Sequence, residues 1–557
     1  MVPAGRQSSP ASDAPLFAGL DVSTQSTKLV VIDPAAGAVV HVDRVDYDRD
    51  LPHYGTREGA VQGLGEGVSE SDPRMWIEAV EVLLGRLAGT GAQGHRRTGG
   101  PADQGTGGPA RRIRCISVSG QQHGLVALAA DGSLARPRAK LWNDFSTAEE
   151  CRILTDAVGG LAAMVREVGN SQRTGYTAGK ILHLKRHEPE SWARASILYL
   201  VHNYVNWFLT GGPDGGVATL EPGDTSGMAL WHPGTGSWSR PVMDAIDPAL
   251  AAKLPPLAPA DRTIGTVGAA LAGRFGLSPG CRVDAGSGDN MYGALGTGNF
   301  EPGIFTVSLG TSGTACTVLD APYVDPTGEI ACYCDSTGRF LPLLCVSNLS
   351  NGYNALRERL GLSHQAFGAL VEEAPPGNGG RVLVPWYEGE RTPDVPFGAA
   401  ATLGFDTTDL AGARPAAACR AVVEGHVLNL WEGSTRMPVT PREIRLTGGL
   451  SASPAWCQTI ADVFGAETVP VAGEGAALGA AIHAAWVWCR EAGVPRPLAE
   501  VAAPFVLLDE QRRRRPRPEH RAAYGVLRKL FRAMSRRLRG LEGEDPFLLR
   551  RELAALT

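Results

Sequence analysis

The chain contains LFAGLDVSTQSTKLVVID at residues 16–33 and repeats this pattern as GIFTVSLGTSGTACTVLD at residues 303–320. Each stretch has an apolar run, a turn of small hydroxyl or Gly residues, and a second apolar run that ends in Asp. This pattern predicts a β-hairpin whose turn exposes several backbone N–H groups on one side. Each hairpin is therefore a candidate phosphate site, and the repeat indicates a duplicated domain.

A second repeat extends outward from the hairpins. The apolar segment Ile113–Val118 precedes SGQQHG, and Glu443–Leu446 precedes TGGLSAS, so each reads as a strand followed by a Gly-containing turn. Between residues 415 and 490, segments with helical spacing of apolar residues alternate with short strands. Strand–helix alternation over a sheet is typical of α/β folds, so we expect two copies of one mixed α/β unit.

Composition is that of a folded protein with more than one core. The 557 residues include 70 Gly and 39 Pro, a share below the roughly 25–30% that is typical of disordered chains. The predicted organisation is a disordered N-terminus (1–14), a first domain (15–284) with a low-complexity insertion (91–112), a second domain (285–510), and a basic C-terminal tail or helix (511–557).

Charge is unevenly distributed along the chain. The net charge is −5, which excludes a generally polycationic nucleic-acid binder, but residues 511–540 carry +11 and the rest −16. Arg512–Arg515 could contact an anionic surface, whereas Leu527, Leu530, Phe531 and Met534 have the spacing of a helix that docks on the protein. We expect the docked helix and no nucleic-acid partner.

No apolar run reaches the roughly 18–20 residues that a membrane span requires, and residues 1–15 have no apolar core of a signal sequence. The ten cysteines lack the paired spacing of a zinc site and read as buried thiols, with packing as the expected role of Cys332 and Cys334. We expect a cytoplasmic protein with no membrane partner.

The two hairpin turns carry groups suited to a polyphosphate and a metal. Asp21 places a carboxylate directly after a strand, and Thr24 and Lys28 follow it. Backbone N–H groups bind phosphate oxygens, and a carboxylate holds Mg²⁺, usually through water. In the second turn, we expect Gly310 and Gly313 to permit positive φ and close backbone approach. Either turn could instead be purely structural.

Three further turns contain candidate ligand groups. Asp289, in GSGDN, is either a general base at the domain junction or the N-cap of a helix. Gln122 and His123 follow a strand and could bind sugar hydroxyls, as could Trp142, although each could also be structural. The Gly448–Gly449 pair, which precedes a helix, could face an anion or a planar ligand, or be ordinary turn chemistry.

Taken in order, these motifs resemble the FGGY carbohydrate kinases from about Phe17 to Tyr524. The segments SGQQHG, LWND and KRHEPE are similar to the xylulokinase branch. The resemblance implies an α/β fold of two ribonuclease-H-like domains, as in actin, Hsp70 and sugar kinases, with ATP and sugar meeting in the interdomain cleft.

The resemblance also implies a role for each matching residue. Asp289 matches the catalytic base, and Asp21 matches the carboxylate that organises Mg²⁺. The expected sugar contacts are Gln122, His123, Asp289 and Asn290, and the expected ATP contacts are Thr24, Lys28, Gly310, Thr311, Gly448 and Gly449. Two departures stand out: Val22-Ser23 where many members have Gly, and Gln122 where many bacterial members have Met.

The reaction implied is transfer of the ATP γ-phosphoryl group to D-xylulose, giving D-xylulose 5-phosphate, with ATP and Mg²⁺ as cofactors. The alternatives are another sugar or polyol kinase, such as a ribulokinase or gluconokinase, and a non-catalytic actin-like nucleotide switch. A switch protein would not need Asp289 or the sugar-side residues Gln122, His123 and Asn290. A homodimer is a further possibility that the sequence leaves open.

Overall fold

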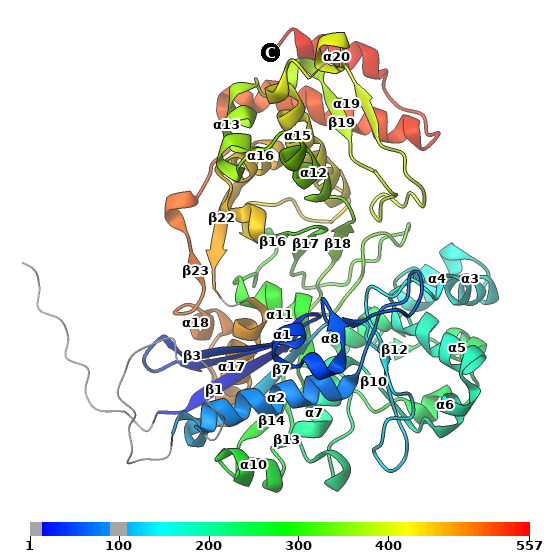
Figure 1. Ribbon diagram of the computed structural model, residues 1–557, viewed down its shortest axis with the longest axis vertical. Coiled ribbons are helices and arrows are strands. Elements are labelled where there is room, and N and C mark those ends of the chain that lie inside the picture. The colour runs from blue at the N-terminus through cyan, green and yellow to red at the C-terminus, as the bar shows by residue number, and fades with distance from the viewer. Residues whose placement is uncertain (1–13, 90–107, 411, 474, 557) are drawn as a thin grey trace, which may run out of the picture.

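The computed structural model describes residues 14–89, 108–410, 412–473 and 475–556, and these form two lobes, each built on a sheet (Figure 1). The lower lobe in this view contains the blue, cyan and green segments, and the upper lobe contains the later green, yellow and red segments. The segment that holds α17 (Gly475–Glu491) and α18 (Leu498–Ala502) crosses this division, since α17 packs on β1, β2 and β7 of the lower lobe and α18 shares a core with these strands.

The first sheet combines a meander with parallel strands. Its antiparallel part is β1 (Leu16–Val22), β2 (Ser26–Asp33) and β3 (Ala38–Asp46). Strand β7 (Ile113–Gly120) runs parallel to β1, and β14 (Arg282–Asp284) runs parallel to β7. The strand order is β13-β14-β7-β1-β2-β3, with β13 (Thr263–Thr266) antiparallel at the edge.

The second sheet repeats this topology. Its antiparallel part is β16 (Ile304–Leu309), β17 (Gly313–Thr317) and β18 (Leu343–Val346). Its parallel part is β21 (Glu443–Thr447) and β22 (Glu467–Ala472), in the order β18-β17-β16-β21-β22-β23, with β23 at Leu507–Leu508. The predicted duplication and both predicted hairpins are confirmed.

Helices cover both sheets. On the first, α2 (Pro73–Ala88) shares a core with Leu16, Ala18 and Leu20 of β1, whereas Phe17 faces α17. Gly19 of β1 is required by this contact, because a Cβ there would collide with the backbone of Ala477 and Ala481. On the second sheet lie α15 (Pro415–Ser434), α16 (Pro454–Phe464) and α13 (His364–Glu373).

A helical extension with its own core lies beside the first sheet, in cyan and green in Figure 1. It contains α3 (Ala148–Ala157), α4 (Leu161–Val168), α5 (Thr177–His187), α6 (Pro189–Arg194) and α9 (Arg240–Ile246). Buried Leu154, Ile181 and Leu184 hold α3 against α5.

The C-terminal tail docks on the second lobe, as predicted. Helix α19 (Arg521–Leu538) buries Leu527, Leu530 and Phe531 in that lobe's core, and α20 (Pro546–Ala554) packs on α19. In the preceding Arg run, two side chains pair with acidic side chains of this lobe: Arg513 lies 2.8 Å from Glu443, and Arg515 lies 2.9 Å from Glu467.

The predicted domain limits stay a prediction, since β15 (Ser287–Gly288) pairs with β7 of the first sheet although it follows residue 284. The predicted disordered N-terminus and most of the 91–112 insertion lie outside the described residues, but Pro109–Arg112 form a 3₁₀ turn. All ten cysteines are free thiols, eight of them buried. No helix in the described part of the chain combines the length and apolarity that a membrane crossing requires.

Candidate active site between the two lobes

Asp289 is the first residue of α11 (Asp289–Gly296), which follows β15. The N-cap of this helix is Gly288, so the capping role that the sequence allowed for Asp289 is wrong. The Asp289 Oδ1 accepts a hydrogen bond of 2.9 Å from the Asn290 backbone N–H. Burial, followed by the charges of Asp21 and Asp224, raises the pKa of Asp289 to about 8. Such a carboxyl group accepts a proton readily once ionised.

Gln122 and Asn290 are joined although they are far apart in the sequence. The Asn290 Nδ2 donates to the Gln122 Oε1 at 2.7 Å, and it also lies 3.2 Å from the Asp289 Oδ1. Gly288 makes this approach possible, because a Cβ there would lie 2.5 Å from the Gln122 Cγ. Three of the four predicted sugar contacts therefore form one connected group.

His123, the fourth, is held in a strained backbone conformation with φ of 65°. Its backbone N–H donates to the Asp224 Oδ1 at 3.2 Å, and its Nε2 lies 3.3 Å from the Tyr333 hydroxyl. Its ring packs on Gly227, where a Cβ would collide with it. Burial lowers the pKa of His123 to about 4, so the ring is neutral at pH 7.

The carbonyl of His123 is fixed by α5. The Lys180 Nζ donates to this oxygen at 2.7 Å and to the Gly175 carbonyl at 2.6 Å, and the Thr177 Oγ1 donates to it at 3.2 Å. Burial lowers the pKa of Lys180 to about 7. These contacts explain how the loop after β7 keeps its strained turn.

The four predicted sugar contacts line a cavity of about 600 Å³ between the lobes, here named the cleft cavity. From the first lobe it is lined by Gln122, His123, Trp142, Tyr176, Asp289 and Asn290, among others. From the second lobe it is lined by Ser312, Thr314, Glu390 and Arg391, among others. Ser312 belongs to the second hairpin turn, so the sugar-side residues and one candidate phosphate turn face the same space.

The first hairpin turn lies beside this group. Asp21 accepts hydrogen bonds from the Ser119 Oγ at 2.9 Å and the Ser23 Oγ at 3.3 Å. Burial raises the pKa of Asp21, although the Ser119 hydrogen bond and the charge of Lys28 act to lower it. Lys28 faces Asp21 across the β1–β2 pair. The Thr24 Oγ1 accepts a 2.9 Å hydrogen bond from the Trp142 indole, which ties this turn to the cleft cavity.

The second hairpin turn contains Gly310 and Thr311. The prediction of positive φ at Gly310 and Gly313 is wrong, since neither has a left-handed backbone. Close packing explains Gly313 instead, because a Cβ there would lie 3.0 Å from Leu349. The Thr311 carbonyl accepts hydrogen bonds from the backbone N–H groups of Leu349 and Ser350, at 3.1 and 3.2 Å.

Gly448 connects this turn to a second pocket. It has φ of 84°, and a Cβ would lie 2.6 Å from the Leu309 carbonyl oxygen, so only Gly fits against β16. Gly449 then opens a pocket of about 570 Å³ between α13 and the start of α16, lined by His364, Gly368, Glu372, Leu450 and Pro454, among others. We name it the α13–α16 pocket.

Sequence reasoning missed several residues of this site: Lys180, Asp224, Tyr176, Tyr333 and Arg391. Lys180 opens the segment KILHLKRHEPE and Asp224 opens DTSGMALW, but neither segment alone indicates which group its first side chain would contact. Tyr333 had no such signal, because its contact with His123 joins residues 210 positions apart.

Comparison with known proteins agrees with this geometry. Residues 16–296 match the N-terminal domain, and residues 306–488 the C-terminal domain, of the FGGY family of carbohydrate kinases. The chain is 33% identical to a xylulose kinase of Haemophilus influenzae, over 90% of this chain and 95% of the relative. It is 35% identical to a xylulose kinase of Streptomyces coelicolor, over 89% of this chain and 93% of the relative.

Solved structures show the same architecture. The crystal structure of xylulose kinase from Bifidobacterium adolescentis superposes with a TM-score of 0.74 at 27% identity, over 92% of this chain and 99% of that one. Ligand-bound xylulose kinase from Lactobacillus acidophilus has a TM-score of 0.79 at 22% identity, over 94% and 98%. The second likeness concerns the fold alone.

Proposed function

The chain belongs to the FGGY family of carbohydrate kinases, and we propose that it transfers the γ-phosphoryl group of ATP to D-xylulose, giving D-xylulose 5-phosphate. The observation that carries this proposal is the cleft cavity, which brings Gln122, His123 and Asp289 to the same space as Ser312 of the second hairpin turn. The names of the relatives at 33–35% identity support D-xylulose as the acceptor.

In this proposal Asp289 is the general base. Ionised, it accepts the proton of the attacking sugar hydroxyl as the new P–O bond forms, and the sugar-side groups Gln122, His123 and Asn290 orient the ketose. Because the transition state of phosphoryl transfer is loose, positioning and charge neutralisation supply most of the rate enhancement.

We assign the nucleotide to the second lobe. The α13–α16 pocket has the size for an adenine base and is lined by Gly449. Gly448, the residue before it, packs on Leu309, which directly precedes the turn at Gly310 and Thr311. Thr24 and Lys28 of the first turn would face the phosphates from the other lobe.

The groups around Asp21 fit a hydrated Mg²⁺. Its carboxylate oxygens are oriented by the Ser119 and Ser23 hydroxyls, and carboxylate oxygen is a preferred ligand of this ion. When bound there with ATP, Mg²⁺ would neutralise charge on the β- and γ-phosphates. A cytoplasmic location is compatible with the ATP-dependent activity. A homodimer stays a prediction.

The test is an acceptor panel with the purified full-length chain, in which ADP release is measured with D-xylulose, D-ribulose, D-gluconate, glycerol and no acceptor. We expect the highest kcat/KM with D-xylulose, and phosphorus NMR should place the phosphate on the 5-hydroxyl. A higher kcat/KM with another acceptor would replace D-xylulose in the proposal. ADP release that no acceptor stimulates would contradict sugar phosphorylation altogether.

A further inference from the structure

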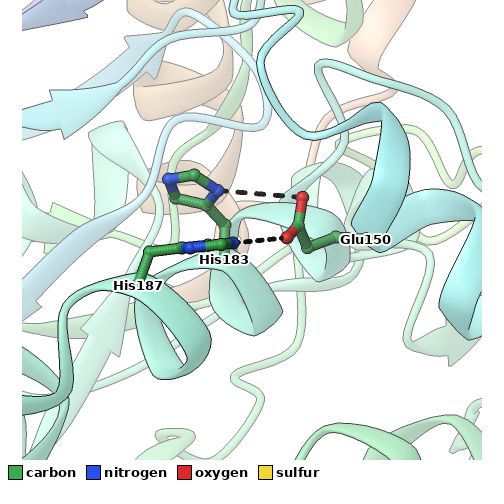
Figure 2. Close-up of side chains that lie close together, drawn as sticks. All are labelled: Glu150, His183 and His187. Carbon is green, nitrogen blue, oxygen red and sulfur yellow. Dashed lines mark hydrogen bonds and ion pairs between the residues drawn. The ribbon is translucent and has the colours of Figure 1, made fainter.

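Two helices of the helical extension meet at a cluster of potential metal ligands outside the cleft cavity. Glu150 lies on α3, and His183 and His187 lie one turn apart on α5. Figure 2 shows both imidazole rings directed toward the same carboxylate. Among the described residues, this is the one group of three or more His, Cys, Asp or Glu side chains with ligand atoms close enough to share an ion.

The geometry of the cluster is close to that of a coordination sphere. The His187 Nε2 lies 3.0 Å and the His183 Nδ1 3.7 Å from the two oxygens of Glu150, and all three ligand atoms lie within 4.8 Å of one another. Zinc bonds of about 2.0–2.2 Å in a tetrahedral site place ligand atoms about 3.4 Å apart. Small side-chain rotations are therefore enough to bring the three atoms onto one ion.

The His183 Nδ1 is the atom that most clearly indicates a bound ion. It is buried, and it has no hydrogen-bond partner among the described residues, although a buried unpaired nitrogen costs roughly 1–3 kcal/mol. Its separation from the Glu150 Oε2 is too long for a hydrogen bond. Two ligands of a shared ion stand at about this separation, so a cation between them would satisfy both atoms.

We propose that Glu150, His183 and His187 form a zinc site that joins α3 to α5. Two imidazoles and a carboxylate are one of the ligand sets of zinc sites with three protein ligands, in which water takes the fourth position. Imidazole nitrogen favours late transition metals over Mg²⁺ and Ca²⁺, which prefer oxygen. His187 is half-exposed, so the ion and its water have access from solvent.

One side chain competes with the ion. The Arg186 Nη1 lies 2.5 Å from the Glu150 Oε1, and its Nη2 lies 3.0 Å from the Glu149 Oε1. Zinc would take the place of this guanidinium at Glu150, while Glu149 keeps Arg186 on the surface. The competition gives the proposal a distinctive consequence, because removal of Arg186 should strengthen metal binding.

The site would clamp the helix that supports His123. Lys180, which fixes the His123 carbonyl, lies one turn before His183 on α5, and Ala148 and Cys151 of α3 line the cleft cavity. Zinc bound between α3 and α5 would therefore stabilise the helical extension. This consequence does not depend on the sugar acceptor or on kinase activity.

The test uses the metal-free full-length chain without nucleotide. Calorimetric titration with ZnCl₂ should show one site per chain, and zinc should raise the Tm by several degrees, since binding to the folded state alone stabilises it. Titration with CoCl₂ should give visible d–d bands without a thiolate-to-metal charge-transfer band, which excludes binding by the cysteines. A thiolate band, or no binding, would overturn the proposal.

Matched variants make the assignment specific. His183→Gln and His187→Gln should each weaken zinc binding by at least about 10–100-fold, whereas Arg186→Gln should tighten it several-fold. The control is His53→Gln, because His53 pairs with Glu78 at 3.1 Å and no third His, Cys, Asp or Glu ligand joins them in the part of the chain that the structure describes, so zinc binding should be unchanged. Equal zinc affinity in His183→Gln and His53→Gln would contradict the site, as would weaker binding in Arg186→Gln.

Discussion

The Asn290 Nδ2 donates a 2.7 Å hydrogen bond to the Gln122 Oε1, and this bond joins the first turn of α11 to the loop after β7. Because the oxygen of the Gln122 amide is engaged, its Nε2 is left buried, with no acceptor among the residues that the structure describes. A buried donor without a partner is costly, so a bound sugar hydroxyl would relieve that cost. The pair thus orients a hydrogen-bond donor toward substrate.

Gln122→Met should raise the KM for D-xylulose by about 2- to 12-fold, because one lost hydrogen bond is worth roughly 0.5–1.5 kcal/mol. Methionine keeps the length of the side chain but has no amide. The KM for ATP should stay constant, as Gln122 lies on the sugar side of the cleft cavity. Steady-state kinetics with each substrate varied would test this. A raised KM for ATP with an unchanged KM for D-xylulose would show that the assignment is wrong.

Asp289→Asn should lower kcat by about 10²–10⁴-fold, the usual contribution of a general base, while nucleotide binding persists. The amide keeps the shape of the side chain but cannot take the proton. ADP release and equilibrium nucleotide binding measure the two effects separately, with exposed Asp131→Asn as the charge-matched control. Turnover within a few-fold of the wild type would show that Asp289 is structural.

The acid limb of the pH profile should move to lower pH in Asp224→Asn. Burial and the charges of Asp21 and Asp224 raise the pKa of Asp289, and a raised pKa means that kcat/KM for sugar increases with pH as the base ionises. Removal of the Asp224 charge lowers this pKa, whereas the amide oxygen can still accept the His123 N–H. Profiles of the wild type and of Asp224→Asn would be recorded at saturating MgATP. The coupling would be refuted if their acid limbs coincide.

Gly19→Ala should destabilise the protein by at least about 1–3 kcal/mol, the usual cost of overpacking, because the new Cβ would meet the α17 backbone at Ala477 and Ala481. The matched control is Gly273→Ala in α10 (Ala269–Phe275), where no atom lies within 4 Å of the new Cβ. That change should stabilise by about 0.5–1 kcal/mol. Thermal unfolding of both variants measures the two effects. Equal Tm values for the two variants would refute the α17 contact.

The chain should not bind duplex DNA in a salt-dependent manner at physiological ionic strength. Arg512, Arg513 and Arg515 are paired with acidic side chains of the second lobe, which reduces the net positive charge that this Arg run offers to phosphates. Binding measured across a salt series should show no steep slope. A steep slope that replacement of Arg512–Arg515 by Ser abolishes would establish a second activity.

Local patterns in the sequence determined both hairpins, the strand that precedes Gln122 and His123, and the docked C-terminal helix. These features depend on the alternation and spacing of neighbouring residues, so a single segment carries the whole signal. The repeat of one hairpin pattern in each half of the chain also determined the duplicated topology. The conformation of Gly310 and Gly313 was predicted wrongly, because packing against Leu349, rather than backbone freedom, explains Gly313.

Only the tertiary structure decided which distant groups meet. Asp224 reaches the His123 backbone across 101 residues, Tyr333 reaches its ring across 210, and α17 returns to cover the first sheet. Glu150 likewise meets His183 and His187 through the packing of α3 on α5. Such contacts join residues that no local period relates, and the elevated pKa of Asp289 arises from burial and from charges that only the fold brings near.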